Sequence, residues 1–154
     1  MAKKQKNITE ELEVKPVQRL LLVQFYGYIS LALLGLALFE LDILPLGYCA
    51  DSTSLQYYLL VIMELLTIAC VPLALKLFSL KKVKHRLYGQ GFPALGLWGS
   101  IRMGLIGLPL LLNVVFYELT IAPTFGYLAI ITSLCLAFVF PSENRCLNEI
   151  DLEE

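Results

Sequence analysis

The sequence predicts an all-α integral membrane protein, a bundle of four spanning helices with both termini on the cytoplasmic side. Hydrophobic residues make up 58% of the 154-residue chain, more than the roughly 45–50% of soluble domains. Four apolar runs come close to the roughly 20 residues that cross a bilayer. All twelve Lys and Arg residues fall on one side of this arrangement, as short basic loops do in the cytoplasm. The length indicates one domain.

The first two spans are predicted at about 20–39 and about 57–78. A polar stretch of mixed charge, residues 1–15, precedes the first span and is interpreted as a frayed tail or a short surface helix. Pro16 suits the first turn of the helix that follows. The first run exceeds the roughly 7–15 apolar residues of a cleaved signal peptide, which excludes that reading. Tyr57 and Tyr58 suit an outer interfacial belt, and Pro72 predicts a kink.

A basic connector at 76–86 follows the second span and orients the whole chain. It holds five of the twelve basic residues, and a Lys/Arg-rich loop between two spans stays in the cytoplasm. The same cluster offers contacts to anionic lipid headgroups. The residues assigned to these roles are Lys81, Lys82, Lys84 and Arg86.

The last two spans are predicted at about 95–117 and about 123–140. The link between them is short, so they are expected to form a tight antiparallel hairpin. Residues 142–154 form an acidic cytoplasmic tail that we expect to be solvated. The two outer loops contain acidic residues and no basic residue: Glu40, Asp42, Asp51 and Glu118.

Small residues line one face of each of the last two spans. Such faces let two helices approach closely in a membrane, and we expect these two to pack on each other; the alternative is that one of them forms a homodimer. The third span contributes Gly96, Ser100, Gly104 and Gly107, and the fourth contributes Ala122, Gly126, Ala129, Ser133 and Ala137.

Four residues with amide or charged side chains lie well inside the predicted spans, namely Gln24, Glu64, Arg102 and Asn113. Counting depth at about 1.5 Å per residue predicts two level pairs, Gln24 with Arg102 and Glu64 with Asn113. One interpretation is that these groups fix helix packing through hydrogen bonds. The other is a polar pathway or small-ligand pocket in which Glu64 takes up protons, because desolvation penalises a charged carboxylate.

No motif predicts catalysis, a metal site, a cofactor or nucleic-acid binding. The four cysteines stand singly and the chain has one histidine, so no cluster has metal-ligand spacing. Cys49 is the one cysteine expected outside, and Cys146 lies where a lipid could be attached. Soluble catalytic signatures are missing.

Three segments resemble small, uncharacterised four-span bacterial inner-membrane proteins. They are residues 72–84 (PLALKLFSLKKVK), residues 108–113 (LPLLLN) and residues 140–143 (FPSE). The resemblance implies a bacterial inner-membrane location and no activity. The four-span length also resembles small multidrug transporters with one membrane glutamate, which in that family lies in the first span; here Glu64 lies in the second.

These observations favour a non-enzymatic structural or accessory subunit of the cell membrane. Its expected partners are the lipid bilayer and either a second copy or a larger membrane complex. The alternative is a small proton-coupled transporter or ligand-binding bundle that uses Glu64, Arg102 and Asn113.

Overall fold

The computed structural model describes residues 2–43, 47 and 51–150, and this part of the chain is helical, without strands. The all-α prediction is confirmed. The helices are α1 (Ala2–Glu40), α2 (Thr53–Lys76), the 3-10 helix η1 (Leu77–Ser79), α3 (Lys81–Gln90), α4 (Phe92–Thr120), α5 (Pro123–Phe138) and α6 (Glu143–Ile150). Three segments are long and apolar enough to cross a membrane: Leu12–Glu40, Thr53–Ser79 and Phe92–Thr120. The fourth apolar helix, α5, has 16 residues.

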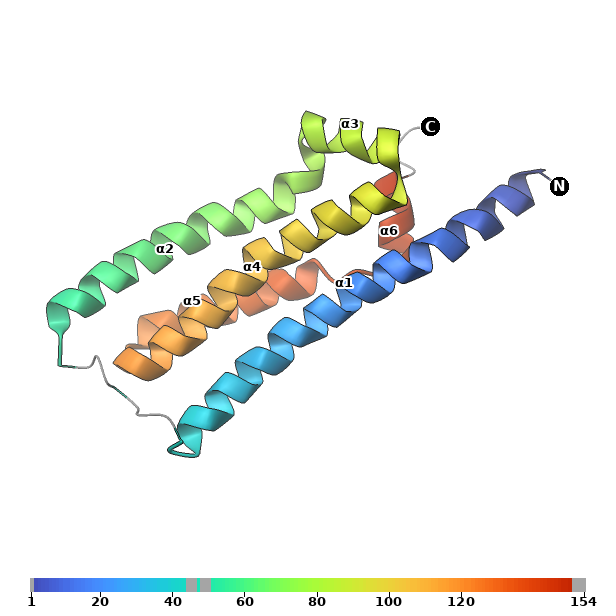
Figure 1. The fold of residues 1–154 in the computed structure, drawn as a ribbon. Coiled ribbons are helices and arrows are strands. Elements are labelled where there is room, and N and C mark those ends of the chain that lie inside the picture. The colour runs from blue at the N-terminus through green and yellow to red at the C-terminus, as the bar shows by residue number, and fades with distance from the viewer. Residues whose placement is uncertain (1, 44–46, 48–50, 151–154) are drawn as a thin grey trace.

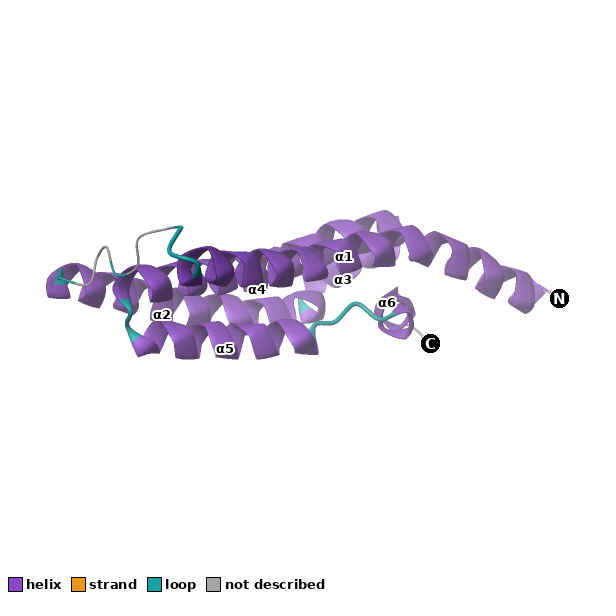
Figure 2. Ribbon diagram, turned by 90° about the horizontal axis from the view of Figure 1, so that it is seen from below, coloured by secondary structure: helices purple, strands orange, loops and turns teal. Residues whose placement is uncertain are grey.

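Helix α4 is the centre of the molecule, lying between α1 and α2 (Figure 1). Helix α5 packs on another face of α4 and also touches α2 (Figure 2). Helix α1 makes its main contacts with α4 and α6. Burial follows this arrangement. Half of the residues in the apolar stretch of α4 are buried, compared with 17% in the apolar stretches of α1 and α2. The arrangement is therefore three helices around one.

Acidic and basic residues lie at opposite ends of the helices. The basic α3 and the C-terminal α6 lie at the same end as the start of α4 (Figure 1). At the other end are Glu40, which closes α1, and Glu118, near the end of α4; Glu40 acts electrostatically on the Glu118 carboxylate, so the two are close in space. The charge separation seen along the sequence is thus a separation in space.

Both predicted tails contain helix: the N-terminal one is continuous with the first span, and helix in the C-terminal one was not expected. Helix α1 begins at Ala2 and continues through Pro16, so Pro16 lies inside the helix and not in its first turn. Lys, Gln and Glu dominate residues 3–13 and are good helix formers, which extends the apolar helix outward. Residues 143–150 form α6, which packs on α1 and α4; residues 151–154 lie outside the described part.

The basic connector is also helical. In α3, Val83 and Leu87 are each 2% exposed, and α3 packs on α4, so two apolar side chains hold a charged helix against the core. Gly91 separates α3 from α4 with φ +63° and ψ −133°, a conformation open to glycine and costly for other residues. Pro93 then suits the first turn of α4.

The glycine face of α4 packs on α1 and not on α5, which corrects the predicted packing. A Cβ atom on Gly107 would lie 2.5 Å from the Tyr28 ring, and one on Gly99 would lie 2.9 Å from Leu21. At Gly96 and Gly104 the nearest atoms are also on α1, in Val17 and Tyr28. Helical phase identified the face correctly, but its partner is the bulky face of α1.

Helices α4 and α5 nevertheless lie side by side as an antiparallel pair. A Cβ atom on Gly126 would lie 3.3 Å from the Tyr117 ring of α4, so this one small residue of α5 does allow the close approach. Ser133 is exposed and Ala129 is half-buried. The turn between the helices places Ile121 in a left-handed conformation, with φ 53°, and Thr120 Oγ1 accepts a hydrogen bond from the Ala122 amide.

Candidate functional site

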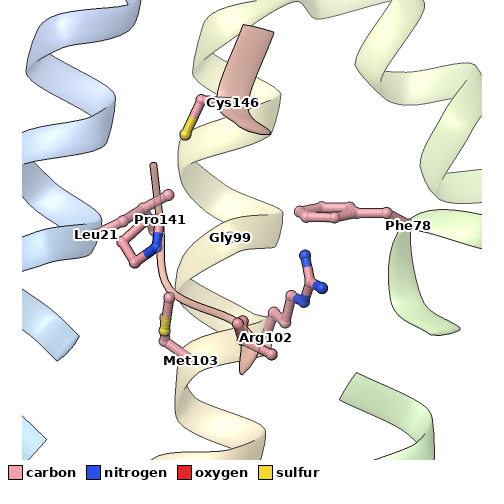
Figure 3. A pocket seen from close by; sticks show the side chains of 8 residues that line it. Leu21, Phe78, Gly99, Arg102, Met103, Pro141 and Cys146 are labelled. Carbon is pink, nitrogen blue, oxygen red and sulfur yellow. The ribbon is translucent and has the colours of Figure 1, made fainter. Parts of the chain in front are cut away.

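Arg102 lies in the core at the end of the molecule that carries the basic helix. Its side chain is 5% exposed, and its guanidinium carbon is 4.9 Å from the centre of the Phe78 ring in η1. Figure 3 shows the guanidinium extending toward Phe78, on the side of α4 away from Leu21 of α1. A cation over an aromatic face is stabilised by the ring quadrupole. Phe78 therefore compensates part of the cost of burying this charge.

The cavity beside Arg102 is small. It is lined mainly by apolar residues from α1, η1, α4 and the segments that follow α5: Leu21, Phe78, Gly99, Met103, Val139, Pro141 and Cys146. Its volume is about 10 Å³, at the lower limit for a single water molecule. The cavity is therefore too small for anything larger than a single water molecule.

The predicted pair of Gln24 and Arg102 is not formed. Gln24 Oε1 is buried and accepts no hydrogen bond from the described protein groups. Gln24 lies between Leu21 and Tyr28, the residues through which α1 packs on the glycine face of α4. Arg102 extends toward Phe78 instead (Figure 3). The two residues are similar in depth, as predicted, but they leave their helices toward different neighbours.

Asn113 joins α4 to α2, although not through Glu64. Its Nδ2 donates a hydrogen bond of 3.3 Å to Thr67 Oγ1. Asn113 is fully buried and Thr67 is 3% exposed. The prediction that Asn113 pairs with Glu64 is therefore wrong by slightly less than one turn of α2. Thr67 follows Glu64 by three residues, and the directions of the two side chains differ by about 60°, with Thr67 facing α4.

Glu64 lies on the exposed surface of α2. The residues of α2 that are buried are Met63, Thr67 and Ala74, and Glu64 is rotated away from them. Its exposed neighbours are apolar, with Leu65 63% and Ile68 61% exposed. Glu64 does not line the Arg102 cavity. The structure therefore does not bring together the three residues of the predicted polar pathway, Glu64, Arg102 and Asn113.

The basic residues of α3 form the polar side of an amphipathic helix. Lys81, Lys82 and Arg86 are exposed and Lys84 is half-buried, while Val83 and Leu87 face α4. Such a helix suits the plane of a membrane surface, with its lysines toward the headgroups. This placement agrees with a headgroup contact for these four residues, which stays a prediction.

The cysteines are placed as packing groups where the structure describes them. Cys146 is 2% exposed and lines the Arg102 cavity from α6 (Figure 3). A thiol so deeply buried is not accessible to a lipid-transferring enzyme, which argues against lipidation in this conformation. Cys70 and Cys135 are half-buried free thiols, and Cys49 lies outside the described residues.

The larger hollows on the surface are apolar grooves. One groove runs between α1 and α5 over the floor made by α4, and its lining includes Leu36, Val114 and Ala129. Another runs between α1 and α2, lined by Tyr28, Cys70 and Pro109 among others. Both are open at the surface, and their lining is suited to hydrocarbon.

Sequence reasoning missed three residues that matter for these sites. Thr67 shares a helical face with Met63 and Ala74, and that pattern was available as a signal. Phase and depth offered no signal for Phe78, because it lies in the 3-10 turn after α2. Glu118 was assigned only to an outer loop, but it is 5% exposed at the end of α4.

The fold and these sites define a helical protein with three helices long and apolar enough to span a membrane. In its core, Asn113 of α4 is hydrogen-bonded to Thr67 of α2, and Arg102 of α4 lies over the Phe78 ring of η1. No protein-family model, curated protein or solved structure matches the chain.

Proposed function

We propose that this chain is an integral protein of the cell membrane, crossing it four times with both termini in the cytoplasm. Helix α5 has 16 residues, or about 24 Å at the helical rise, somewhat less than the roughly 30 Å hydrocarbon core. It starts beside the end of α4 and leads back to α6, which packs on α1 and α4. This return path supports a fourth crossing.

The charge distribution supports the orientation. The end that carries α3 holds Lys81, Lys82, Lys84 and Arg86, and basic segments next to spanning helices remain on the cytoplasmic side. Glu40 and Glu118 lie at the opposite end. The proposed location in a bacterial inner membrane is based on the resemblance to small four-span proteins of that membrane.

The proposed role is that of a non-enzymatic structural or accessory subunit. The observation that supports this role is that the buried polar groups of α4 contact neighbouring helical segments. Asn113 is bonded to Thr67, and Arg102 lies over Phe78 beside a cavity of about 10 Å³. Neither group faces a space that admits a substrate. Asn113 connects α4 to α2 and Arg102 connects α4 to η1, which is consistent with a role in helix packing.

The test is to purify the tagged chain from its native membranes in a mild detergent and to quantify what remains bound after size-exclusion chromatography. We expect another membrane protein in near-stoichiometric amount. The same preparation is reconstituted into vesicles, and proton movement is followed with a pH-sensitive dye. A chain that purifies alone and supports a pH-driven flux that Glu64→Gln abolishes would contradict the proposal and favour the proton-coupled transporter.

A further inference from the structure

The strongest unexplained feature of the molecule is a carboxyl group on an apolar surface. Glu64 is exposed, and apolar residues continue on both sides of it along α2. Five apolar residues, 59–63, separate it from Tyr58 on the outward side, and Leu65 and Leu66 follow it on the inward side. Glu64 is about 10 Å from Tyr57 at the helical rise. It therefore faces the hydrocarbon layer and not the water at its edge.

A charge in this position needs a partner. Ionisable side chains facing lipid are costly, so they are found paired or turned toward the inside of a bundle. Glu64 is turned outward, and its neighbour in sequence Met63 takes the buried position with 3% exposure. Nothing in the packing of α2 on α4 or α5 requires a carboxyl group on this face.

The chain itself offers no cation at this level among the described residues. Arg102 is the one basic residue within the apolar part of α4, and it is buried over Phe78. Phe78 follows Glu64 by 14 residues, so the two levels differ by about 20 Å. Lys76, at the inner end of α2, is about 18 Å from Glu64 on the same count.

We propose that the Glu64 face of α2, formed by Glu64, Leu65 and Ile68, is the docking surface for a membrane-spanning helix of another protein that carries Lys or Arg at the level of Glu64. Charge complementarity selects this occupant. A second copy related by a two-fold axis through this face would bring Glu64 against Glu64 and would supply no cation to it. Arg102 of a second copy is buried and cannot reach this surface.

This inference rests on the proposed function, and it names the surface and the chemistry of the partner. The affinity expected from one such contact is modest. Polar contacts between membrane helices correspond to about a 3- to 30-fold change in association. Apolar packing of Leu65 and Ile68 adds to it without selecting the charge.

The test uses three synthetic membrane-spanning leucine peptides that differ at a single position. This position lies level with Glu64 in the membrane, and it is Lys in the first peptide, Leu in the second and Glu in the third. Each peptide carries a donor dye, and the purified full chain carries an acceptor dye in phosphatidylcholine vesicles. We expect energy transfer to indicate about 3- to 30-fold tighter association of the Lys peptide than of the Leu peptide. The Glu peptide should bind no better than the Leu peptide.

Two pairs of variants locate the contact. Glu64→Gln keeps the shape and removes the charge, so the preference for Lys should disappear; Ser133→Ala, an exposed polar residue of α5, should retain it. Ile68→Trp adds bulk to the Glu64 face and should weaken association with all three peptides. Leu34→Trp, on the exposed side of α1, should not. Thermal unfolding of each variant verifies that it is folded.

Three results would overturn the docking surface. The first is an equal response to the Lys and Leu peptides, and the second is an unchanged preference for Lys in folded Glu64→Gln. The third is energy transfer between two labelled copies of the chain that Glu64→Gln removes, since the occupant is then a second copy. A subunit that co-purifies from native membranes while the Lys peptide fails keeps the proposed function and rejects this surface. A chain that purifies alone but prefers the Lys peptide keeps this surface and rejects the proposed function.

Discussion

Asn113 of α4 donates a hydrogen bond to Thr67 of α2 at 3.3 Å, and neither side chain is more than 3% exposed. This contact lies on the buried face of α2, which also contains Met63 and Ala74. Had α2 turned by about 60°, Glu64 would have faced α4 and Thr67 the lipid. The rotation of α2 about its axis thus places Thr67 inside and Glu64 outside.

Removing the Thr67 hydroxyl tests this contact. Thr67→Val keeps the volume of the side chain and leaves the Asn113 amide without its acceptor, so we expect a loss of about 1 kcal/mol or less in detergent. Thr67→Ser should lose less. Thermal unfolding followed by circular dichroism measures both. In a double-mutant cycle with Asn113→Leu, additive effects would show that the two side chains do not interact.

The contact of α4 with α1 predicts a ranking of glycine substitutions. Gly107→Ala places a Cβ atom 2.5 Å from the Tyr28 ring, whereas at Gly104 the nearest atom, the Tyr28 hydroxyl oxygen, would be 3.7 Å away. Overpacking of a tight core costs about 1–3 kcal/mol, so Gly107→Ala should lower the melting temperature and Gly104→Ala should change it little. Tyr28→Ala should relieve the added cost at Gly107. Equal melting temperatures for the two alanine variants would refute the proposed fit.

The Arg102 environment predicts a dependence on aromatic character. Phe78→Leu removes the ring under the guanidinium, which lies 4.9 Å from its centre, and should cost about 0.5–2 kcal/mol of stability. Phe78→Trp keeps a ring face and should recover much of the loss if it is accommodated. Tyr127→Leu, at an aromatic residue that is 66% exposed, is the matched control. If Phe78→Leu and Tyr127→Leu lose the same stability, the ring does not act on Arg102.

Orientation in the membrane is tested by labelling introduced thiols. In a Cys49→Ser background, an impermeant maleimide should label Asp51→Cys in intact cells, and Lys82→Cys only after the cells are permeabilised. Both positions are exposed, so the membrane and not burial decides the result. Native Cys146 is unsuitable as an inner reporter because it is 2% exposed and should resist from either side. The reverse labelling pattern would place the termini outside.

The sequence by itself determined the helices and their charged ends. Long apolar runs have no alternative to helix in a membrane, because each backbone donor and acceptor must be satisfied within the segment. The prediction therefore matched α2 and α4 to within a few residues, and it placed the short link before Pro123. It undercounted the helical tails, because their polar composition suits both solvated chain and helix.

Only the tertiary structure decided which helical faces meet. Helical phase defines a glycine face on α4, but the sequence does not tell whether α5 or α1 packs closely on it. Tyr28 and Leu21 fill the surface above Gly107 and Gly99, and α5 is left to pack beside Tyr117. The same holds for polar pairs, since depth selects a level while rotation selects a partner. The side chains of Thr67 and Glu64 point in directions that differ by about 60° around α2. Because α2 packs on α4 with the Thr67 side inward, Asn113 bonds to Thr67 and Glu64 stays on the surface.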